Sequence, residues 1–494
     1  MTPQPNPLQT QAIEGLIEFA QTREHMFALL EGPAGSGKTF TVAAVIKALQ
    51  ETNPDRKVVV ATPTHKAKKV LVNALARYGI SVNATTVSAL IGKAPSTTDD
   101  PDDEGNPQWL RSDSGALEPD TLLIVDEVSM VGITDAKAIQ KVVKRNNSQV
   151  IFSGDFAQLR PVKDASIQDA MEKVPVRFKL AEVMRSGSKG IVAVSKSVRV
   201  TGDIDLDAVD NQNVFIYNDS KKFEEAFVAT EGAVAVAYTN KRVAELNHLK
   251  RKAIYGDKLK PFMPNETVIL TEQPFFVRKN YGGKWESVKV ADNNDQLVVL
   301  DSGIRCEDGN AFAEGYVHST MLRLRNPETA LEFDAKALTY DEYVNNLKPM
   351  LEDVLKNTRM FTKRLEAISR DDIGEISEAG LSDYFNEDEI AWIVANASYK
   401  SNWVRPTLDG FKPVKGSWAS LKGLVWAKDY FGWKQQFAVL LYEHASTAHK
   451  AQGSTYQACF VDWPNLLTIR DADDRQAACY VAVSRAADTL HIRI

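Results

Sequence analysis

Residues 27–49 read FALLEGPAGSGKTFTVAAVIKAL, and this stretch decides how the first part of the chain folds. The short apolar run Phe27–Leu30 is typical of a buried strand, and the apolar spacing from Lys38 to Leu49 is typical of a helix. Between them, Gly32–Thr39 (GPAGSGKT) fits the pattern G-x-x-x-x-G-K-T in the strand–turn–helix context that gives the pattern meaning. The stretch therefore predicts a loop that holds phosphate groups on backbone N–H groups at a helix N-terminus.

The same alternation of apolar runs and helical patterns extends on both sides of this loop. In the first quarter and just beyond it, the predicted strands are Val58–Ala61, Leu122–Val125 and Val150–Ser153, and Lys66–Tyr78 is a predicted helix. Parallel strands covered by helices on both faces explain such runs, so the expected fold class is α/β. The rhythm returns in Val214–Tyr217, Lys221–Ala229, Ala233–Tyr238, Phe437–Tyr442, Ala458–Val461, Asp471–Arg485 and Leu490–Ile494.

Two segments interrupt this rhythm. Ser96–Gly115 is polar, acidic and rich in turn residues, and it carries one aromatic residue, Trp109, so it predicts a protruding loop or hairpin at about residues 88–120. From about 256 to 440 the chain offers β-like pieces and one long helical stretch near Asp341–Arg370. We expect a first lobe at 1–180, a second at 181–255 and 441–494, and an inserted domain at 256–440.

Composition limits the class of protein. The 494 residues include 65 acidic and 59 basic ones, for a net charge of −6, which excludes a polycation but not a local nucleic-acid groove. The three cysteines are too scattered for a disulfide framework or a four-thiolate zinc site, which favours a reducing compartment. No apolar run reaches the ~20 residues of a membrane span, and no signal peptide is recognisable, so we expect a soluble, cytoplasmic protein.

The side chains that follow the strands predict chemistry on a nucleotide. Lys38 is placed to neutralise phosphate charge, while Thr39 and Asp126 are placed to hold Mg²⁺. Glu127 would orient and deprotonate an attacking water, and Gln158, after the next strand, would sense the γ-phosphate. For the pair Asp126 and Glu127, capping of the next helix remains the alternative.

These segments together resemble a known family. Gly32–Thr39, Asp126–Met130 and Gly154–Val162 resemble motifs I, II and III of superfamily 1 helicases, within the 5′→3′ group 1B and its Dda/RecD branch. The resemblance extends in order along the chain, to motif Ia (Ala61–Lys66), Ib (Thr85–Ser88), IV (Leu180–Arg185), V (Ser446–Thr455) and VI (Tyr480–Ala486).

The resemblance implies roles for further residues. Arg185 and Arg485 would be arginine fingers. The residues implied to bind the nucleotide are Gln9, which would read adenine, with Gly32, Pro33, Ala34, Gly35, Ser36, Gly37, Lys38, Thr39, Gln452 and Gly453. Those implied to bind DNA are Thr62, Pro63, Thr64, His65, Thr86, Trp109, Thr447, His449 and Lys450. For each DNA contact, an ordinary capping or surface role remains open, and Trp109 could instead pack back on its lobe.

The family also implies two RecA-like lobes, with a β-hairpin in the first and an SH3-like β-barrel plus helical tower inserted in the second. The expected function is that of a monomeric ATP-dependent DNA helicase that uses Mg²⁺, moves 5′→3′ on single-stranded DNA and unwinds forks. Single-strand-binding, replication or recombination proteins are the candidate partners, and no membrane is expected. The main alternative is a DNA-stimulated P-loop ATPase that displaces proteins without processive unwinding, and a small-molecule kinase is a more distant one.

Overall fold

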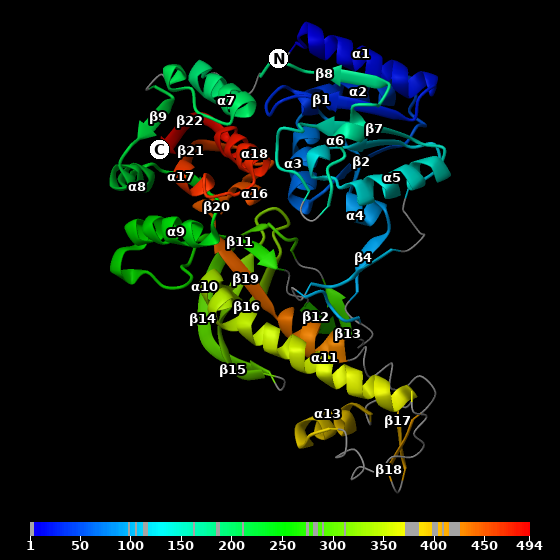
Figure 1. Cartoon of the computed structure of the whole chain (residues 1–494), viewed down its shortest axis with the longest axis vertical. Coiled ribbons are helices and arrows are strands. Elements are labelled where there is room, and N and C mark those ends of the chain that lie inside the picture. The colour runs from blue at the N-terminus through cyan, green and yellow to red at the C-terminus, as the bar shows by residue number, and fades with distance from the viewer. Residues whose placement is uncertain are drawn as a thin grey trace. The chain divides into compact units, whose positions relative to one another are not determined.

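The computed structural model of the chain (Figure 1) describes most of its residues. They run from Gln4 to Ile494, without 97–98, 104–105, 112–116, 162–163, 184–187, 210–211, 273–275, 280–284, 289–290, 311–312, 371–384, 398–403, 408–409 and 414–424. Within the described part, no helix is both long enough and apolar enough to cross a membrane.

The chain divides into two compact units. The first comprises Met1–Lys93, Arg111–Leu259 and Tyr442–Ile494, and the second comprises Ala94–Leu110 and Lys260–Leu441. The first unit contains two parallel sheets, which we call the first and second lobes together with their helices. The predicted α/β class is therefore confirmed for these lobes.

The first lobe is built on six parallel strands in the order β3-β2-β6-β7-β1-β8. One apolar cluster, with α1 to α3, covers one face, and a second cluster, with α5, covers the other. The strands are β1 (Phe27–Glu31), β2 (Val58–Thr62), β3 (Asn83–Thr86), β6 (Leu122–Val125), β7 (Gln149–Gly154) and β8 (Val176–Lys179). The helices are α1 (Pro7–Thr22), α2 (Lys38–Thr52), α3 (His65–Ala76), α4 (Val87–Leu90), η1 (Val128–Met130), α5 (Ile133–Arg145) and α6 (Gln168–Met171).

The second lobe is a five-stranded parallel sheet in the order β20-β10-β21-β22-β9. Helices again cover both faces, α7 and α18 on one and α8 and α9 on the other. The strands are β9 (Val214–Tyr217), β10 (Val234–Ala237), β20 (Ala445–Thr447), β21 (Tyr456–Asp462) and β22 (Ala486–Arg493). The helices are α7 (Lys189–Thr201), η2 (Leu206–Ala208), α8 (Ser220–Ala229), α9 (Asn240–Tyr255), η3 (Gly256–Lys258), α16 (Ala448–Ala451), α17 (Trp463–Leu466) and α18 (Ala472–Val483).

The second unit contains a closed barrel of β11 (Thr267–Glu272), β14 (Gln296–Asn310), β15 (Ala313–Arg325), β16 (Glu332–Thr339) and β19 (Phe437–Tyr442). An apolar cluster that includes Trp426 and Trp433 packs the barrel against its helices. These are α10 (Tyr340–Glu342), η4 (Tyr343–Leu347), α11 (Lys348–Arg370), α13 (Glu387–Ala397), η5 (Trp426–Phe431) and α15 (Gly432–Lys434). Small hairpins pair β4 (Lys93–Pro95) with β5 (Trp109–Arg111), β12 (Phe276–Lys279) with β13 (Trp285–Val288), and β17 (Val404–Thr407) with β18 (Gly410–Pro413).

One expectation about the strands is wrong. Phe437–Tyr442 was expected to resume the parallel α/β pattern, but this strand, β19, pairs with β16 and closes the barrel. Its first four residues are buried. A fully buried apolar run looks the same in a barrel and in a parallel sheet, so periodicity alone does not assign it to either.

A buried ion-pair cluster joins the second lobe's sheet to its helices. The Asp462 side chain is fully buried at the end of β21, where it accepts hydrogen bonds from Arg242 Nε at 2.7 Å and from Arg493 Nη2 at 2.6 Å. Arg242 also contacts Glu224 and, at the surface, Glu245. Removal of Asp462 would leave Arg493 without this carboxylate and Arg242 with Glu224 and Glu245 only, at a largely buried position.

Asp462→Ala should therefore lower the free energy of unfolding by about 3–5 kcal/mol. The matched control is Glu245→Ala, which removes a 45%-exposed partner of the same arginine and should cost less than about 1 kcal/mol. Denaturant unfolding of the two variants measures the difference. Equal losses would contradict the structural role assigned to Asp462.

Candidate functional site

A cavity of about 440 Å³ lies at the carboxyl edge of the first lobe's sheet, beside the loop Gly32–Thr39. Its volume is within the range of sites for cofactor-sized ligands. Both lobes contribute to its lining, since Gly453 and Arg485 belong to the second lobe. The lining comprises Gln4, Gln9, Ala34, Gly35, Gly37, Lys38, Thr39, Phe40, Ala67, Val70, Leu71, Ala74, Tyr78, Asp126, Glu127, Gln158, Gly453 and Arg485.

The loop between β1 and α2 has the backbone that its glycines predict. Gly37 caps α2 with φ +88°, a backbone angle that favours glycine, and a Cβ atom there would lie 2.3 Å from Gln9 Nε2 and displace that side chain. Lys38 Nζ donates hydrogen bonds to Gly32 O at 2.7 Å and Pro33 O at 3.1 Å. The cation is thus held at the loop by carbonyl groups that a phosphate can replace.

Several polar atoms around the loop are buried with no hydrogen-bond partner among the described residues. They are Ser36 Oγ, Glu127 Oε2, Gln158 Oε1 and both side-chain amide atoms of Gln452. Buried polar atoms without partners are costly and rare, and they are common where a ligand supplies the missing partners. The Ser36 hydroxyl and the Gln452 amide nitrogen can donate to a phosphate, whereas the Glu127 and Gln158 oxygens accept and therefore fit a water molecule.

Glu127 has the features of a general base. It follows β6 in the left-handed conformation at φ +54°, a conformation that few residues other than glycine adopt and that recurs at functional sites. Burial and then the neighbouring Asp126 raise the pKa of Glu127, against the opposing charges of Lys38 and Arg485. A raised pKa makes the carboxylate a stronger base for a proton on water.

Arg485 reaches this space from the second lobe. It follows α18, and its guanidinium donates to Val481 O at 2.9 Å, Ser454 O at 3.2 Å and Ser484 Oγ at 2.7 Å. These bonds hold a buried cation at the wall of the cavity that the phosphate-binding loop also lines. The second predicted finger, Arg185, lies outside the described residues.

The apolar end of the cavity was not anticipated from the sequence. Phe40 and Tyr78 line it with their rings 5.8 Å apart, together with aliphatic residues of α3. The signal available was an aromatic residue directly after Thr39. Gln9 is nearby, but its side chain already accepts from Asn6 N at 3.0 Å and donates to Ser36 O at 3.1 Å. Gln9 therefore braces the loop as well as lining the cavity.

The threonines expected at DNA act as helix caps. Thr64 caps α3, Thr86 caps α4 and Thr447 caps α16, each by accepting a backbone N–H. A capping hydroxyl accepts a bond and still has its own proton to donate, so capping and phosphate contact are compatible. Thr62 differs, because it is fully buried and its hydroxyl already donates to Thr64 O at 2.9 Å.

Lys66 links the capped helix ends of the first lobe to that of the second. Its Nζ donates to Lys450 O at 2.6 Å, so the start of α3 in the first lobe meets α16 in the second. Burial, followed by the charges of Arg485 and Lys450, lowers the pKa of Lys66 to about 8. The two lysines make the junction of α3 and α16 positively charged, which suits anions. Pro63 and His65 lie on the same turn, and His449 is exposed on α16.

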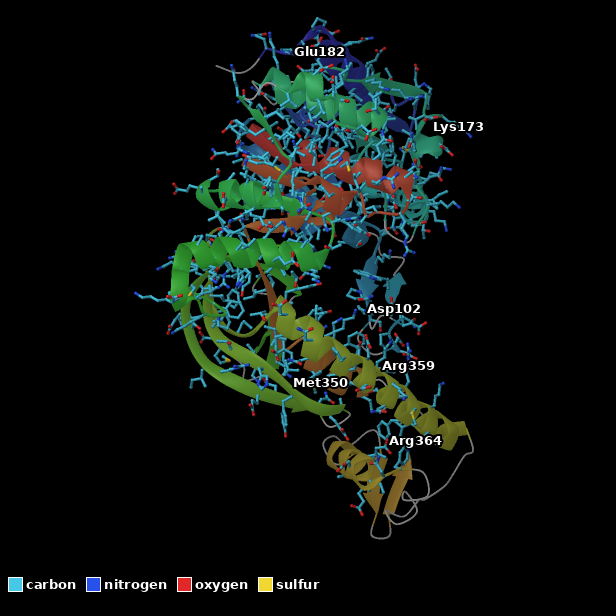
Figure 2. All side chains as sticks on the ribbon, turned by 60° about the vertical axis from the view of Figure 1, so that its left-hand side comes forward. Asp102, Lys173, Glu182, Met350, Arg359 and Arg364 are labelled. Atoms are coloured by element: carbon cyan, nitrogen blue, oxygen red, sulfur yellow. The ribbon has the colours of Figure 1, made fainter. Side chains whose placement is uncertain are left out.

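The hairpin and the long helix α11 meet within the second unit. Arg359 of α11 donates to Asp100 Oδ1 at 2.8 Å, Asp103 Oδ1 at 3.1 Å and Pro101 O at 2.7 Å, and Figure 2 shows it beside the Asp102 segment. Trp109 on β5 keeps 51% of its surface exposed. The acidic run is thus bound to a cation of the helix, and the aromatic ring remains accessible.

The raised pKa of Glu127 gives a test. A general base must lose its proton to act, so ATP hydrolysis should fall as the pH drops through a value above 4.5, the ordinary pKa of a glutamate. The pH profile of kcat/KM at saturating DNA measures this limb. Glu127→Gln should leave a slow residual reaction whose rate shows no such acidic limb. An acidic limb near 4.5, or one that persists in Glu127→Gln, would contradict the role.

Comparisons with known proteins agree with the order of these segments. Residues 4–218 match the family model of an AAA domain, and residues 442–492 match that of a UvrD-like helicase C-terminal domain. The chain is 26% identical to the ATP-dependent DNA helicase dda of Enterobacteria phage T4, over 97% of this chain and 96% of that one. It is 20% identical to an uncharacterised protein of Acanthamoeba polyphaga mimivirus over 99% of both.

Among solved structures, the Pif1 helicase from Candida albicans aligns at a TM-score of 0.47 and 14% identity, covering 100% of this chain and 94% of that one. The Bacteroides Pif1 bound to single-stranded DNA aligns at 0.45 and 13% identity, over 99% and 92%. In the order of its motifs along both lobes, and in its match over nearly the full length of the phage helicase, the chain is similar to the Dda-like group of superfamily 1B helicases.

Proposed function

We propose that this protein is an ATP-dependent DNA helicase that moves 5′→3′ along single-stranded DNA and unwinds duplex ahead of it. The observation that carries the proposal is the cavity itself, where the phosphate-binding loop, Glu127 and Gln158 of the first lobe share one space with Arg485 of the second. Such an arrangement can hydrolyse a nucleotide and relate its state to the positions of two lobes.

Each residue has a role in hydrolysis that its surroundings support. Lys38 leaves the loop carbonyls for the β- and γ-phosphates, which the loop's N–H groups also bind. Glu127 takes the proton of the attacking water, and Gln158 orders that water against the γ-phosphate. Arg485, with Arg185 as the second finger, stabilises the charge that develops on the transferred group. Gln452 and Gly453 adjoin the nucleotide from the second lobe.

Magnesium fits the same site. Thr39 and Asp126 both line the cavity and would hold the ion. No cluster of three metal-binding side chains occurs within the described residues. The bound ion supplies charge neutralisation at the phosphates.

DNA binding is supported by the capped helix ends of both lobes. Thr64 and Thr86 start helices beside neighbouring strands of the first lobe, and Thr447 does so in the second. N–H groups at such ends bind phosphate oxygens without reading base sequence. A single strand across both lobes would be moved when ATP binding closes the cleft and hydrolysis opens it.

We further propose that the closed barrel is SH3-like and that α11 with its neighbours forms a tower inserted in the second of two RecA-like lobes, within residues 256–440. The flanking boundaries are 1–180 for the first lobe, and 181–255 with 441–494 for the second. The hairpin would separate the strands, with Trp109 against the base pair at the fork. The contacts of Asp100 and Asp103 with Arg359 would hold the hairpin in place during strand separation.

The chain is proposed to act as a monomer in the cytoplasm, the host's if the gene is viral, on single strands and forks. Single-strand-binding, replication and recombination proteins are the proposed partners. The alternative function is a DNA-stimulated ATPase that displaces proteins without processive unwinding, and it differs from the first in what happens to duplex DNA.

Strand displacement on matched duplexes separates these functions. A duplex with a 5′ single-stranded tail should be unwound with ATP and Mg²⁺, and one with a 3′ tail should not. Lys38→Ala, which loses the phosphate-binding cation, should abolish both ATP hydrolysis and unwinding. ATP hydrolysis on tailed DNA without any strand displacement would favour the alternative, and unwinding of the 3′-tailed duplex would overturn the direction.

The hairpin makes a second prediction. Trp109→Ala should leave DNA-stimulated ATP hydrolysis within about twofold and reduce unwinding by about tenfold, because only strand separation uses the exposed ring. Arg359→Ala should act in the same direction by freeing the hairpin from α11. Arg323→Ala, at an exposed ion pair of the barrel, is the control and should change neither rate. Equal loss of both activities in Trp109→Ala would remove the hairpin from strand separation.

A further inference from the structure

A hydrogen-bonded cluster lies behind the phosphate-binding loop, outside the cavity. Asp155 follows β7 in the first lobe and is completely buried. Its Oδ1 accepts from Arg199 Nη2 at 2.8 Å and from Ala157 N at 3.2 Å, and its Oδ2 accepts from the Tyr480 hydroxyl at 2.8 Å. Arg199 lies on α7 and Tyr480 on α18, so the side-chain donors to this first-lobe carboxylate come from the second lobe.

The Tyr480 hydroxyl makes a second bond, in which it accepts from Ala34 N at 3.0 Å. Ala34 belongs to the loop that lines the cavity. One oxygen atom therefore joins the phosphate-binding loop, the strand-end carboxylate and a helix of the opposite lobe. Burial, with the charge of Asp155, raises the pKa of Tyr480, so the hydroxyl keeps the proton that it donates.

Arg199, the cation of this cluster, keeps its charge beside Asp155. Burial opposes the charge of Arg199, but the adjacent Asp155 carboxylate outweighs that effect and raises the pKa of the guanidinium. The guanidinium also lies 5.9 Å from the centre of the Tyr480 ring. A buried carboxylate with three donors is a rigid acceptor, so the position of the tyrosine is well defined.

Tyr480 is close in sequence to the finger. It occupies the last turn of α18, which ends at Val483, and Arg485 Nε donates back to Val481 O at 2.9 Å. The segment from Tyr480 to Arg485 thus carries both the hydroxyl that touches the loop and the guanidinium that lines the cavity. A shift of the hydroxyl relative to Ala34 would move the guanidinium relative to the phosphates.

We propose that Tyr480 is a positioning residue for ATP hydrolysis, whose hydroxyl, bonded to Ala34 and Asp155, sets the distance between the Arg485 guanidinium and the phosphate-binding loop. The proposal rests on the ATP hydrolysis proposed above. Tyr480 does not itself appear among the described residues that line the cavity, so it acts through Arg485 and not on the nucleotide. Asp155 and Arg199 hold the hydroxyl in place.

Tyr480→Phe removes the hydroxyl alone and keeps the buried ring. The kcat of DNA-stimulated ATP hydrolysis should fall about tenfold while KM for ATP changes less than about twofold, because finger placement matters most in the transition state. Tyr217→Phe is the matched control. It removes a hydroxyl bonded to His491 Nδ1 at 3.0 Å in the same lobe, outside the cavity, and should leave kcat unchanged.

A double mutant tests the route of the effect. In an Arg485→Lys background, Tyr480→Phe should cause no further loss of kcat, because the hydroxyl then has no guanidinium to place. Losses that multiply, or an unchanged kcat in Tyr480→Phe alone, overturn the proposal. If the wild-type chain hydrolyses no ATP, the proposed function fails with it, whereas an active wild type with an unaffected Tyr480→Phe overturns this inference alone.

Discussion

The rest of this structure depends on one interaction. Carboxylates at the carboxyl edge of the first lobe's sheet are stabilised by cations and hydrogen-bond donors from the second lobe. Asp155 and Glu127 both end strands of the first lobe in surroundings with little water. A carboxylate in that position is costly unless opposite charge or hydrogen bonds compensate it. Arg199, Tyr480 and Arg485 come from the second lobe. The cavity is therefore lined by both lobes.

Much of the first unit could be predicted from the sequence, because short-range signals define it. Leu122–Val125 and Val214–Tyr217 match β6 and β9 at both ends, since an apolar run between polar turns marks a buried strand directly. The loop Gly32–Thr39 was also predictable, because glycine spacing and a lysine at a helix start are local features. The edge strand β8, with alternating and partly exposed residues, gave a weaker signal and was missed.

The remaining features depend on contacts between segments distant in the chain. The partnership of Asp155 with Tyr480 spans 325 residues, and no local pattern predicts it. The aromatic end of the cavity arises because α3 brings Tyr78 back to Phe40. β14 and β15 are long strands because pairing with each other stabilises residues that have little strand preference alone. The threonines show another limit of prediction from sequence. Helix capping and phosphate binding use the same residue type, so the sequence does not distinguish them.

Part of the chain's negative charge, the acidic run at the hairpin, has a structural role. Asp100 and Asp103 are partners of Arg359, so part of the excess of acid over base is used internally to hold one segment against another. The Asp103 side chain is almost fully exposed, and exposed ion pairs weaken as salt shortens the screening length to about 8 Å at physiological ionic strength. The stiffness of the hairpin is therefore expected to depend on ionic strength. The ion pair of the buried Asp155 carboxylate is screened much less by salt.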